Sequence, residues 1–328
     1  MKSKFTLEDL KKYTINNMVT IVFVVLCIVG FSVSGLPIGL VLNELVARIG
    51  RNTFLVLALI IPVVAGMGLN FGIVIGAMAA QIVIIAVTHW GITGIPGFVL
   101  CVVLSTPLSI LFGYFTGKIL NKTKGQEMIT SMILGFFANG LYMLLFLFLV
   151  GTVIPMKNPV LMISGGVGIK NTVDLNGGIK YALDNIIKFP LYYVVYYLAI
   201  ICLIAVVAFA IYKFKTMNKK IGFKLVFYAV ISIIVFFGCQ INSIALVLYE
   251  VKVPIFTLIV IGLLCLFNIL IFKTKLGQDF RTVGQNAVVA NASVINVDRT
   301  RIKAIIISTV LAGWGQLIFL QNIGTLNT

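Results

Sequence analysis

The chain has 328 residues, of which 60% are hydrophobic and only 10% are charged, and its mean hydropathy is +1.13. Soluble domains carry about 25% charged residues, so this composition excludes a water-soluble fold and predicts an all-α polytopic membrane protein. The formal net charge is +16. No arginine-rich run is interleaved with aromatic residues, so basic loops facing the cytoplasm and anionic lipid explain this charge better than a nucleic-acid partner does.

Apolar runs recur along the whole chain, and a membrane-spanning helix needs about 20 such residues. We expect about nine transmembrane helices in one transmembrane domain over residues 1–328, with an uncleaved first span behind an N-terminal cluster of lysines. The predicted spans are about 18–34, 53–67, 71–88, 95–117, 128–153, 191–212, 222–240, 254–272 and 303–322.

Two stretches in the first quarter of the chain depart from this simple pattern. Residues 34–52 carry Leu and Ile on one helical face and charged side chains on the other, which predicts an interfacial helix. The sequence GMGLNFG, residues 66–72, separates two apolar runs by almost no loop. We therefore predict a helix that breaks at membrane depth, where the backbone must be buried in protein or line a polar cavity.

Residues 156–190 form the longest predicted loop, on the side opposite the N-terminus. Its GGVGIK stretch lacks the spacing and the closing Lys-Ser/Thr of a phosphate-binding P-loop. We expect turns that lead into a short surface helix at about 179–187.

The distribution of basic residues predicts the orientation. With a cytoplasmic N-terminus, most of the 25 Lys and Arg residues lie on the cytoplasmic side, as the positive-inside rule requires. We expect the protein to lie in the plasma membrane. In this orientation the loop 274–302 is cytoplasmic.

The predicted spans contain almost no ionisable side chain. The single histidine, His89, lies at a boundary beside Trp90, and the five cysteines have no metal-binding spacing. Proton-driven carriers need a titratable group inside the membrane, and no hydrolytic motif is present either. Sodium coupling through carbonyl and hydroxyl groups stays open. We predict no enzymatic activity, no cofactor and no metal, and, if the protein moves a solute uphill, an energy source in another subunit.

The polar residues within the spans are neutral, which suits the path of an uncharged, hydroxyl-rich solute. Hydrogen bonding between helices, worth about 0.6 kcal/mol per bond, is the alternative explanation for each of them. Asn70 is the exception that favours a solute path, because it lies at the predicted helix break. The candidate path residues are Asn70, Gln81, Asn139 and Gln316.

The sequence VGQNAVVANASVINVDRTRI, residues 283–302, differs from the rest of the chain. Asn286 or Gln285 is expected to start a short helix of small side chains, which contact lipid poorly but let the surface of another protein approach closely. The flanking charges include Asp298 and Arg301. A short helix of this kind at the membrane surface is what a docking element needs.

This segment resembles the cytoplasmic loop of ABC importer permeases of the ribose, simple-sugar, nucleoside and branched-chain amino acid group. Their pattern is roughly G-x-N-x-x-A-A-x-x-S-G-I-x-V-x-x-x-K, followed by a span containing A-G. The matching positions here are Gly284, Asn286, Ala290, Ser293, Ile295, Val297 and Arg301, and then Leu311 to Gly313. Val294 stands where Gly is usual, and a positive φ would strain a β-branched residue, so we expect a different turn or a longer helix.

The resemblance implies a coupling helix that docks on a cytoplasmic ATP-binding subunit. It also implies a second permease copy or a paralogue, an extracytoplasmic solute-binding protein, and a C-terminally truncated chain, because members of the group continue beyond this point. The substrate class stays open among sugars, nucleosides and amino acids, with neutral path residues favouring a sugar or a nucleoside. The implied coupling residues are Gly284, Asn286, Ala287, Val289, Ala290, Ser293, Asp298 and Arg301.

Two other classes of protein fit the composition: a stand-alone secondary carrier or channel, and a membrane scaffold without transport activity. A carrier should tolerate Ala290→Glu, whereas a docking helix should not. A scaffold predicts that changes at Asn70 or Gln81 leave uptake untouched.

Overall fold

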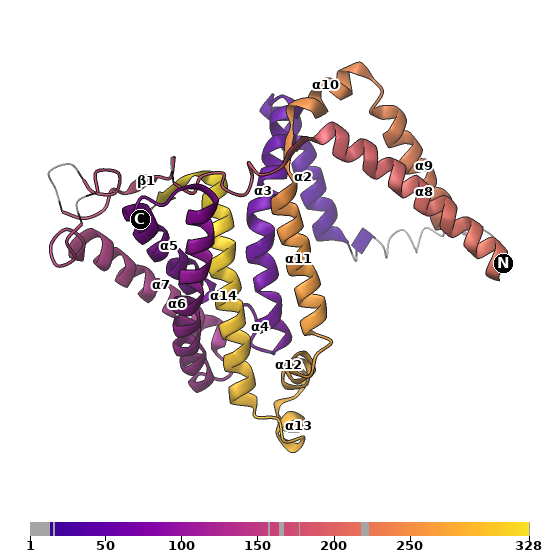
Figure 1. Cartoon of the computed structure of the whole chain (residues 1–328). Helices are drawn as coiled ribbons and strands as arrows, with labels where there is room; N and C mark the ends of the chain where they lie inside the picture. Colours follow the sequence, from indigo (N-terminus) through magenta and orange to yellow (C-terminus); the bar gives the residue numbers. More distant parts are fainter. Residues whose placement is uncertain are drawn as a thin grey trace. The chain divides into compact units, whose positions relative to one another are not determined.

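The computed structural model describes residues 14–15, 17–156, 158–163, 167–176, 178–217 and 223–327 (Figure 1). The described chain is mostly helical, as expected for an all-α polytopic membrane protein. Its helices are α2 (Met18–Ser34), α3 (Ile38–Ala58), α4 (Ile60–Val64), α5 (Ile73–His89), α6 (Gly94–Lys122), α7 (Glu127–Met143), the π-helix η1 (Leu144–Leu149), α8 (Leu191–Met217), α9 (Phe223–Gly238), α10 (Asn242–Glu250), α11 (Ile255–Ile271), α12 (Lys275–Gln285), α13 (Ala287–Ala292) and α14 (Val297–Ile323). Its strands are β1 (Thr172–Asp174), β2 (Lys188–Pro190), β3 (Lys252–Pro254) and β4 (Thr325–Asn327).

The chain divides into two compact units. One contains Met1–Leu45 and Ala199–Val251, and the other contains Val46–Leu198 and Lys252–Thr328. The described side chains of the first unit are mostly exposed, and α2 has no buried residue. Exposed apolar helices of this kind are suited to lipid or protein neighbours rather than to water.

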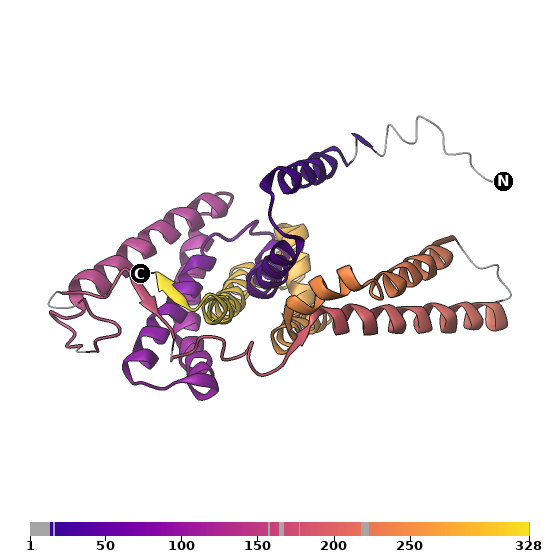
Figure 2. The same ribbon diagram turned by 90° about the horizontal axis from the view of Figure 1, so that it is seen from above.

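The second unit is built around α14, which packs mainly against α6 and α5. Figures 1 and 2 show these three helices side by side. Small residues allow the close approach: a Cβ atom added to Gly313 would lie 2.8 Å from the Ser109 hydroxyl, and one added to Gly113 would lie 2.9 Å from the Cα of Ile306. In lipid the hydrophobic effect does not drive helices together, so their association depends on close van der Waals packing, which small residues permit.

One end of α14 is covered by two short antiparallel sheets. Val173 of β1 lies opposite Leu326 of β4, and Phe189 of β2 lies opposite Val253 of β3. The long loop, the start of α11 and the segment after α14 therefore meet at one end of this unit. The sequence predicts that all of these segments are extracytoplasmic.

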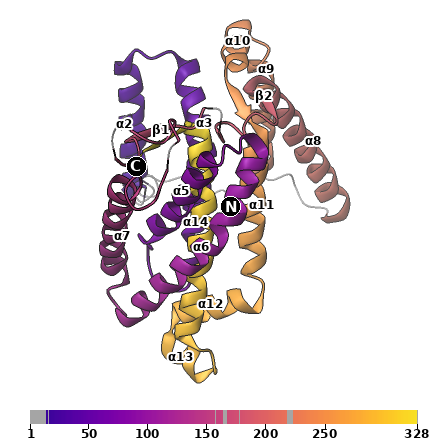
Figure 3. The same ribbon diagram turned by 60° about the vertical axis from the view of Figure 1, so that its left-hand side comes forward.

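The other end of α14 carries α12 and α13, which Figure 3 shows beyond the end of the long helices. Phe280 of α12 is fully buried and joins the main hydrophobic core, so α12 is anchored to the bundle rather than projecting from it. α14 then begins at Val297 and runs the full length of the bundle.

Within the described ranges, five helices are long and apolar enough to cross a membrane, or up to seven if each of two bent helix pairs is one span. α2 and α5 are apolar but shorter. Length and composition in the structure therefore show a multi-pass protein, while the predicted count of nine is not confirmed.

Two predictions about single elements are wrong. Residues 34–52 do not form a separate interfacial helix, because α3 runs on without interruption to Ala58; Arg51 lies over the Phe319 ring at 6.0 Å and is accommodated in this way. Residues 179–187 form successive turns, not a helix. Tyr181 adopts a φ of 53° there, and its N–H donates to the Gln321 carbonyl of α14 at 2.8 Å, so contacts between distant segments override local helix propensity.

Candidate functional site

The segment that sequence analysis singled out is a compact arrangement of short capped helices. Asn286 begins α13, as predicted: its Oδ1 accepts hydrogen bonds from the backbone N–H of Val288 at 2.9 Å and of Val289 at 3.2 Å. Asn296 begins α14 in the same way, accepting from the N–H of Arg299 at 2.9 Å. Caps of this type satisfy the free N–H groups of a first helical turn and define where each helix starts.

The two faces of α13 differ sharply. Ala290 is fully buried and packs with Val283 and Val297 in a small cluster that holds α12, α13 and the start of α14 together. Val288 is 77% exposed and Val289 is 52% exposed. Because such short apolar side chains gain nothing from facing water, the surface formed by Val288 and Val289, which we call the valine face, is suited to contact with another protein.

The turn after α13 has a positive φ, contrary to the expectation from sequence. Val294 has a φ of 62° and is 94% exposed. The chain therefore keeps a left-handed turn of the kind that favours Gly, and a β-branched residue occupies it at a conformational cost of about 1–2 kcal/mol. The residues on either side of Val294 hold the turn. The N–H of Ser293 donates to the Val289 carbonyl and the N–H of Ile295 donates to the Ala290 carbonyl, at 3.0 Å each.

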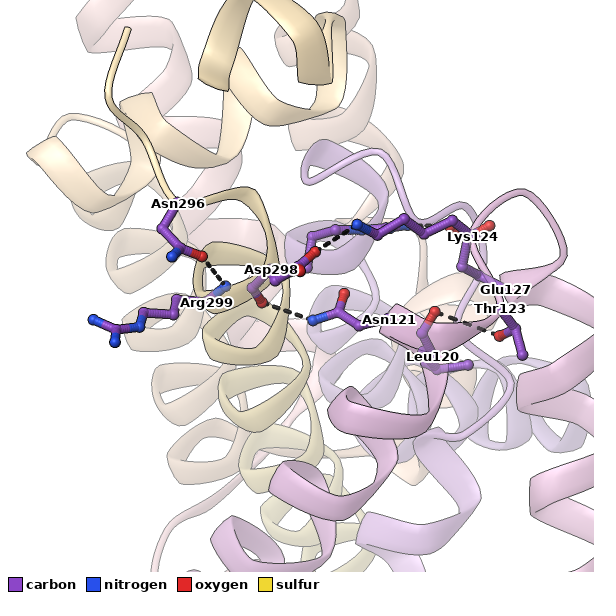
Figure 4. A network of polar contacts seen from close by, with 9 residues as sticks. Leu120, Asn121, Thr123, Lys124, Glu127, Asn296, Asp298 and Arg299 are labelled. Carbon is purple, nitrogen blue, oxygen red and sulfur yellow. Dashed lines mark hydrogen bonds and ion pairs between the residues drawn. The ribbon is translucent and has the colours of Figure 1, made fainter. Parts of the chain in front are cut away.

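Asp298 and Arg301 connect the start of α14 to the turn between α6 and α7. Asp298 makes an ion pair with Lys124 at 2.7 Å, and its backbone carbonyl accepts from the Asn121 amide at 2.8 Å, as Figure 4 shows. The Arg301 guanidinium makes an ion pair with Glu127, and both side chains are nearly buried. Of the predicted coupling residues, Asp298 and Arg301 therefore stabilise the helix bundle. Ala287 and Ser293 are exposed beside the valine face.

The helical path is interrupted between the second and third apolar runs, as predicted. α4 ends at Val64 and α5 begins at Ile73, with positive φ at Gly66 and Gly68 between them. Asn70 in this turn is only 2% exposed.

The hydrogen bonds of Asn70 are incomplete. Its Oδ1 accepts from the Gly72 N–H at 3.0 Å, but its amide nitrogen is buried without a hydrogen-bond partner. A buried amide N–H that makes no bond costs about 1–3 kcal/mol, which a bound solute or water can recover.

The other three predicted path residues have different surroundings. Gln81 on α5 and Gln316 on α14 are half-buried, and Asn139 on α7 is exposed. Asn70 is therefore the member of the set that combines burial with a free hydrogen-bonding group.

A cavity of about 470 Å³ lies among α5, α6 and α7. Its lining is apolar apart from Thr116 and Tyr142. It lacks the convergent polar groups that bind a hydroxyl-rich solute, so it does not supply the predicted path.

Sequence reasoning missed a buried carboxylate at the opposite end of α14. Asp184 is 2% exposed and accepts hydrogen bonds from the Thr257 hydroxyl at 2.5 Å, the Gln321 amide at 2.9 Å and the Asn322 amide at 2.6 Å. Its partners are 73 or more positions away in the chain, so no local pattern indicates them. Within the described ranges, no three His, Cys, Asp or Glu side chains gather as a metal site would require.

Comparison with known protein families decides what kind of protein this arrangement belongs to. Residues 186–327 match the family described as branched-chain amino acid transport system, permease component. Over these residues, which are less than half of the chain, the protein is similar to this permease family. The match supports an ABC permease subunit of the group that residues 283–302 resemble, which confirms that resemblance. No curated protein and no solved structure matches the chain.

The matched part of the permease contains α12, α13 and α14 in full, together with the second sheet at the other end. The helix break with Asn70 and the α6–α7 turn lie outside the match. Permeases of this family are transport components, so the match suggests a role in transport.

Proposed function

We propose that this permease is the membrane-spanning subunit of an ABC importer for a small, uncharged solute, either a sugar or a nucleoside, and that a separate cytoplasmic ATP-binding subunit drives it. The observation that carries this proposal is the valine face: an exposed apolar surface on a capped helix, within the part of the chain that matches the family. Helices that present apolar anchors to a groove are a common mode of protein recognition.

The surroundings of α13 support a coupling role. Ala290, Val283 and Val297 bind α13 to both neighbouring helices, so a force on the valine face acts on α12 and α14 together. ATP-driven closure of the ATP-binding subunits would then move the permease helices. The coupling is reciprocal, so solute delivery on the outer side would alter ATP hydrolysis on the inner side.

We propose about nine membrane spans with the N-terminus in the cytoplasm of a plasma-membrane protein. Five long helices, two bent pairs and two shorter apolar helices among the described residues support this count. Lys124 meets Asp298, and β1 meets β4, so the segments assigned to each side by charge lie at the same ends of the second unit.

The solute path is proposed to include Asn70, with Gln81, Asn139 and Gln316 as further candidates. A buried amide with a free N–H suits a hydroxyl or carbonyl group of a neutral solute, and the apolar cavity in a single copy does not. We therefore propose that a second permease copy or a paralogue completes the path. An extracytoplasmic solute-binding protein delivers the solute, and lipid surrounds the exposed helices.

The proposal is tested by purifying the tagged chain from its native membranes and identifying the proteins that copurify with it. We expect an ATP-binding subunit to copurify with the unmodified chain and to be lost from a Val288→Glu, Val289→Glu variant, because two buried charges would face its docking groove without partners. Ala290→Glu is a poorer test, since Ala290 is buried and a charge there would disrupt α13 itself.

Val153→Glu is the matched control, because Val153 is 72% exposed and lies in the turns after η1, far along the chain from the valine face. It should retain the ATP-binding subunit. Recovery of the unmodified chain alone, together with solute uptake that needs no nucleotide, would support a stand-alone carrier instead.

A further inference from the structure

The structure places the end of α12 directly against the helix break that contains Asn70. A Cβ atom added to Gly66 would lie 2.7 Å from the Cα of Gly284, and one added to Gly284 would lie 3.0 Å from the Gly66 nitrogen and nearer still to the Val64 carbonyl oxygen. These are contacts between backbones with no side chain between them. Only glycine at position 284 permits them, because the obstructing atoms belong to the backbone and have no rotamer with which to give way.

Gly284 is also connected to α13. The residue before it, Val283, packs on Ala290 in the cluster that holds α13. One turn earlier, Phe280 is fully buried in the main core. α12 is therefore held between α13 and the helix break, and its last turn cannot move toward the break without displacing it.

The helix break is held from its far side as well. Met67 packs with Leu120 of α6 and Ile305 of α14, and the Phe71 N–H donates to the Ser131 hydroxyl of α7 at 3.1 Å. A displacement at Gly66 is thus opposed by other helices, and the turn between these points, which includes Asn70, must take up the difference.

We propose that Gly284 and Gly66 are positioning residues that connect the coupling segment to the solute site. Movement of α13 shifts the end of α12, the glycine contact passes that shift to residues 65–72, and the unpaired amide of Asn70 moves relative to the path. The connection rests on the proposed function, because it assigns Asn70 to the solute path and α13 to an ATP-binding subunit. The position of Asn70 would then respond to nucleotide binding in the partner subunit, although Asn70 and α13 lie on different elements.

The test is hydrogen–deuterium exchange on the permease copurified with its ATP-binding subunits, with and without a non-hydrolysable ATP analogue. In the unmodified complex, we expect the exchange of amides in residues 286–296 and in residues 65–72 to change about fivefold or more, the usual scale of coupling between linked sites. In Gly284→Ala, residues 286–296 should respond as before, while the response of residues 65–72 falls to less than about half. The amides of Phe71 and Gly72 are direct reporters, because each donates to a side chain of the break or its neighbour.

Gly262→Ala is the control, because Gly262 lies on α11 with nothing within 4 Å of an added Cβ atom. It should respond as the unmodified complex does. The inference is overturned if Gly284→Ala leaves the response of residues 65–72 intact. It is overturned equally if these residues do not respond in the unmodified complex while 286–296 do, a result that involves no variant and cannot come from misfolding. A lack of response at 286–296 in the unmodified complex would contradict the proposed function itself.

Discussion

Carboxylates hold both ends of α14, but their partners differ: cations at the start of the helix and neutral hydrogen-bond donors at its end. At the start of the helix, Glu127 and Asp298 meet the cations Arg301 and Lys124 in ion pairs. At its end, Asp184 is buried among the neutral donors of Thr257, Gln321 and Asn322, and no Lys or Arg of the described residues makes an ion pair with it.

The difference shows how the permease fastens its central helix on either side of the membrane. The exposed Lys124–Asp298 pair can exchange partners at little cost, and it lies at the end where α13 is proposed to be moved. The Glu127–Arg301 pair at the same end is nearly buried and is more costly to break. A buried carboxylate with several neutral donors is costly to disrupt, since every partner then loses its bond inside protein. We infer that the Asp184 end is the fixed end of α14 and that the other end is the adjustable one.

Asp184→Ala should have the largest effect of the changes at the two ends. Three donors lose a charged acceptor in a buried site, and hydrogen bonds to charged groups are worth about 1.5–3 kcal/mol each before relaxation. We expect a loss of about 4 kcal/mol in the free energy of unfolding, measured in detergent by denaturant titration.

Asp174→Ala provides the comparison, because Asp174 lies in β1, at the same end of the second unit, but is exposed. Its loss should cost about 0.5 kcal/mol or less. An equal effect at the two positions would remove the distinction between a fixed and an adjustable end.

The Glu127–Arg301 pair should show an intermediate effect. Glu127→Ala leaves the guanidinium of Arg301 without its partner in a nearly buried site, so we expect a loss of about 3 kcal/mol in the same titration. The exchanged pair, Glu127→Arg with Arg301→Glu, should recover more than half of this loss, because the attraction between the two charges is restored.

The Asp184 end of α14 offers no such recovery. Exchanging Asp184 and Gln321 would place the carboxylate on α14, away from the donor geometry that surrounds Asp184. Failure of the exchanged Glu127–Arg301 pair to recover stability would show that this contact depends on local shape rather than on charge.

The Lys124–Asp298 pair should have the smallest effect. Its side chains are 55% and 56% exposed, so Lys124→Ala should lower stability by about 0.5 kcal/mol or less. The effect should disappear at about 1 M salt, where the Debye length is about 3 Å. An effect that persists unchanged in high salt would mean that Lys124 acts through packing.

Sequence analysis predicted those features of the site that depend on neighbours in the chain. The Asn286 cap, the glycine-containing break at 66–72 and the short helix after Asn286 all have local signals, because caps and left-handed turns select particular residue types. The same logic misjudged Val294, since the turn is held by hydrogen bonds from its neighbours rather than by the residue at its centre.

The features that sequence analysis missed depend on contacts between distant segments. The continuous helix α3 is one of them. Arg51 lies over the ring of Phe319, a contact that no local sequence pattern indicates. Asp184 and the Gly66–Gly284 contact are others, because each joins elements that meet only in the folded bundle. The proposed path through Asn70 could be predicted from its place at the break, but its unpaired amide could not.

Drive from the cytoplasmic side through α13 is what separates the proposed ABC permease subunit from a stand-alone carrier. Its most direct test measures solute accumulation in sealed vesicles that contain the purified chain, with and without the copurifying ATP-binding subunits and ATP, using labelled ribose and labelled uridine as probes and the solute-binding protein on the outside. This mode of drive predicts that at least one probe accumulates only when all components are present, and that accumulation stops in the Val288→Glu, Val289→Glu variant. Accumulation by the chain alone without nucleotide would contradict it.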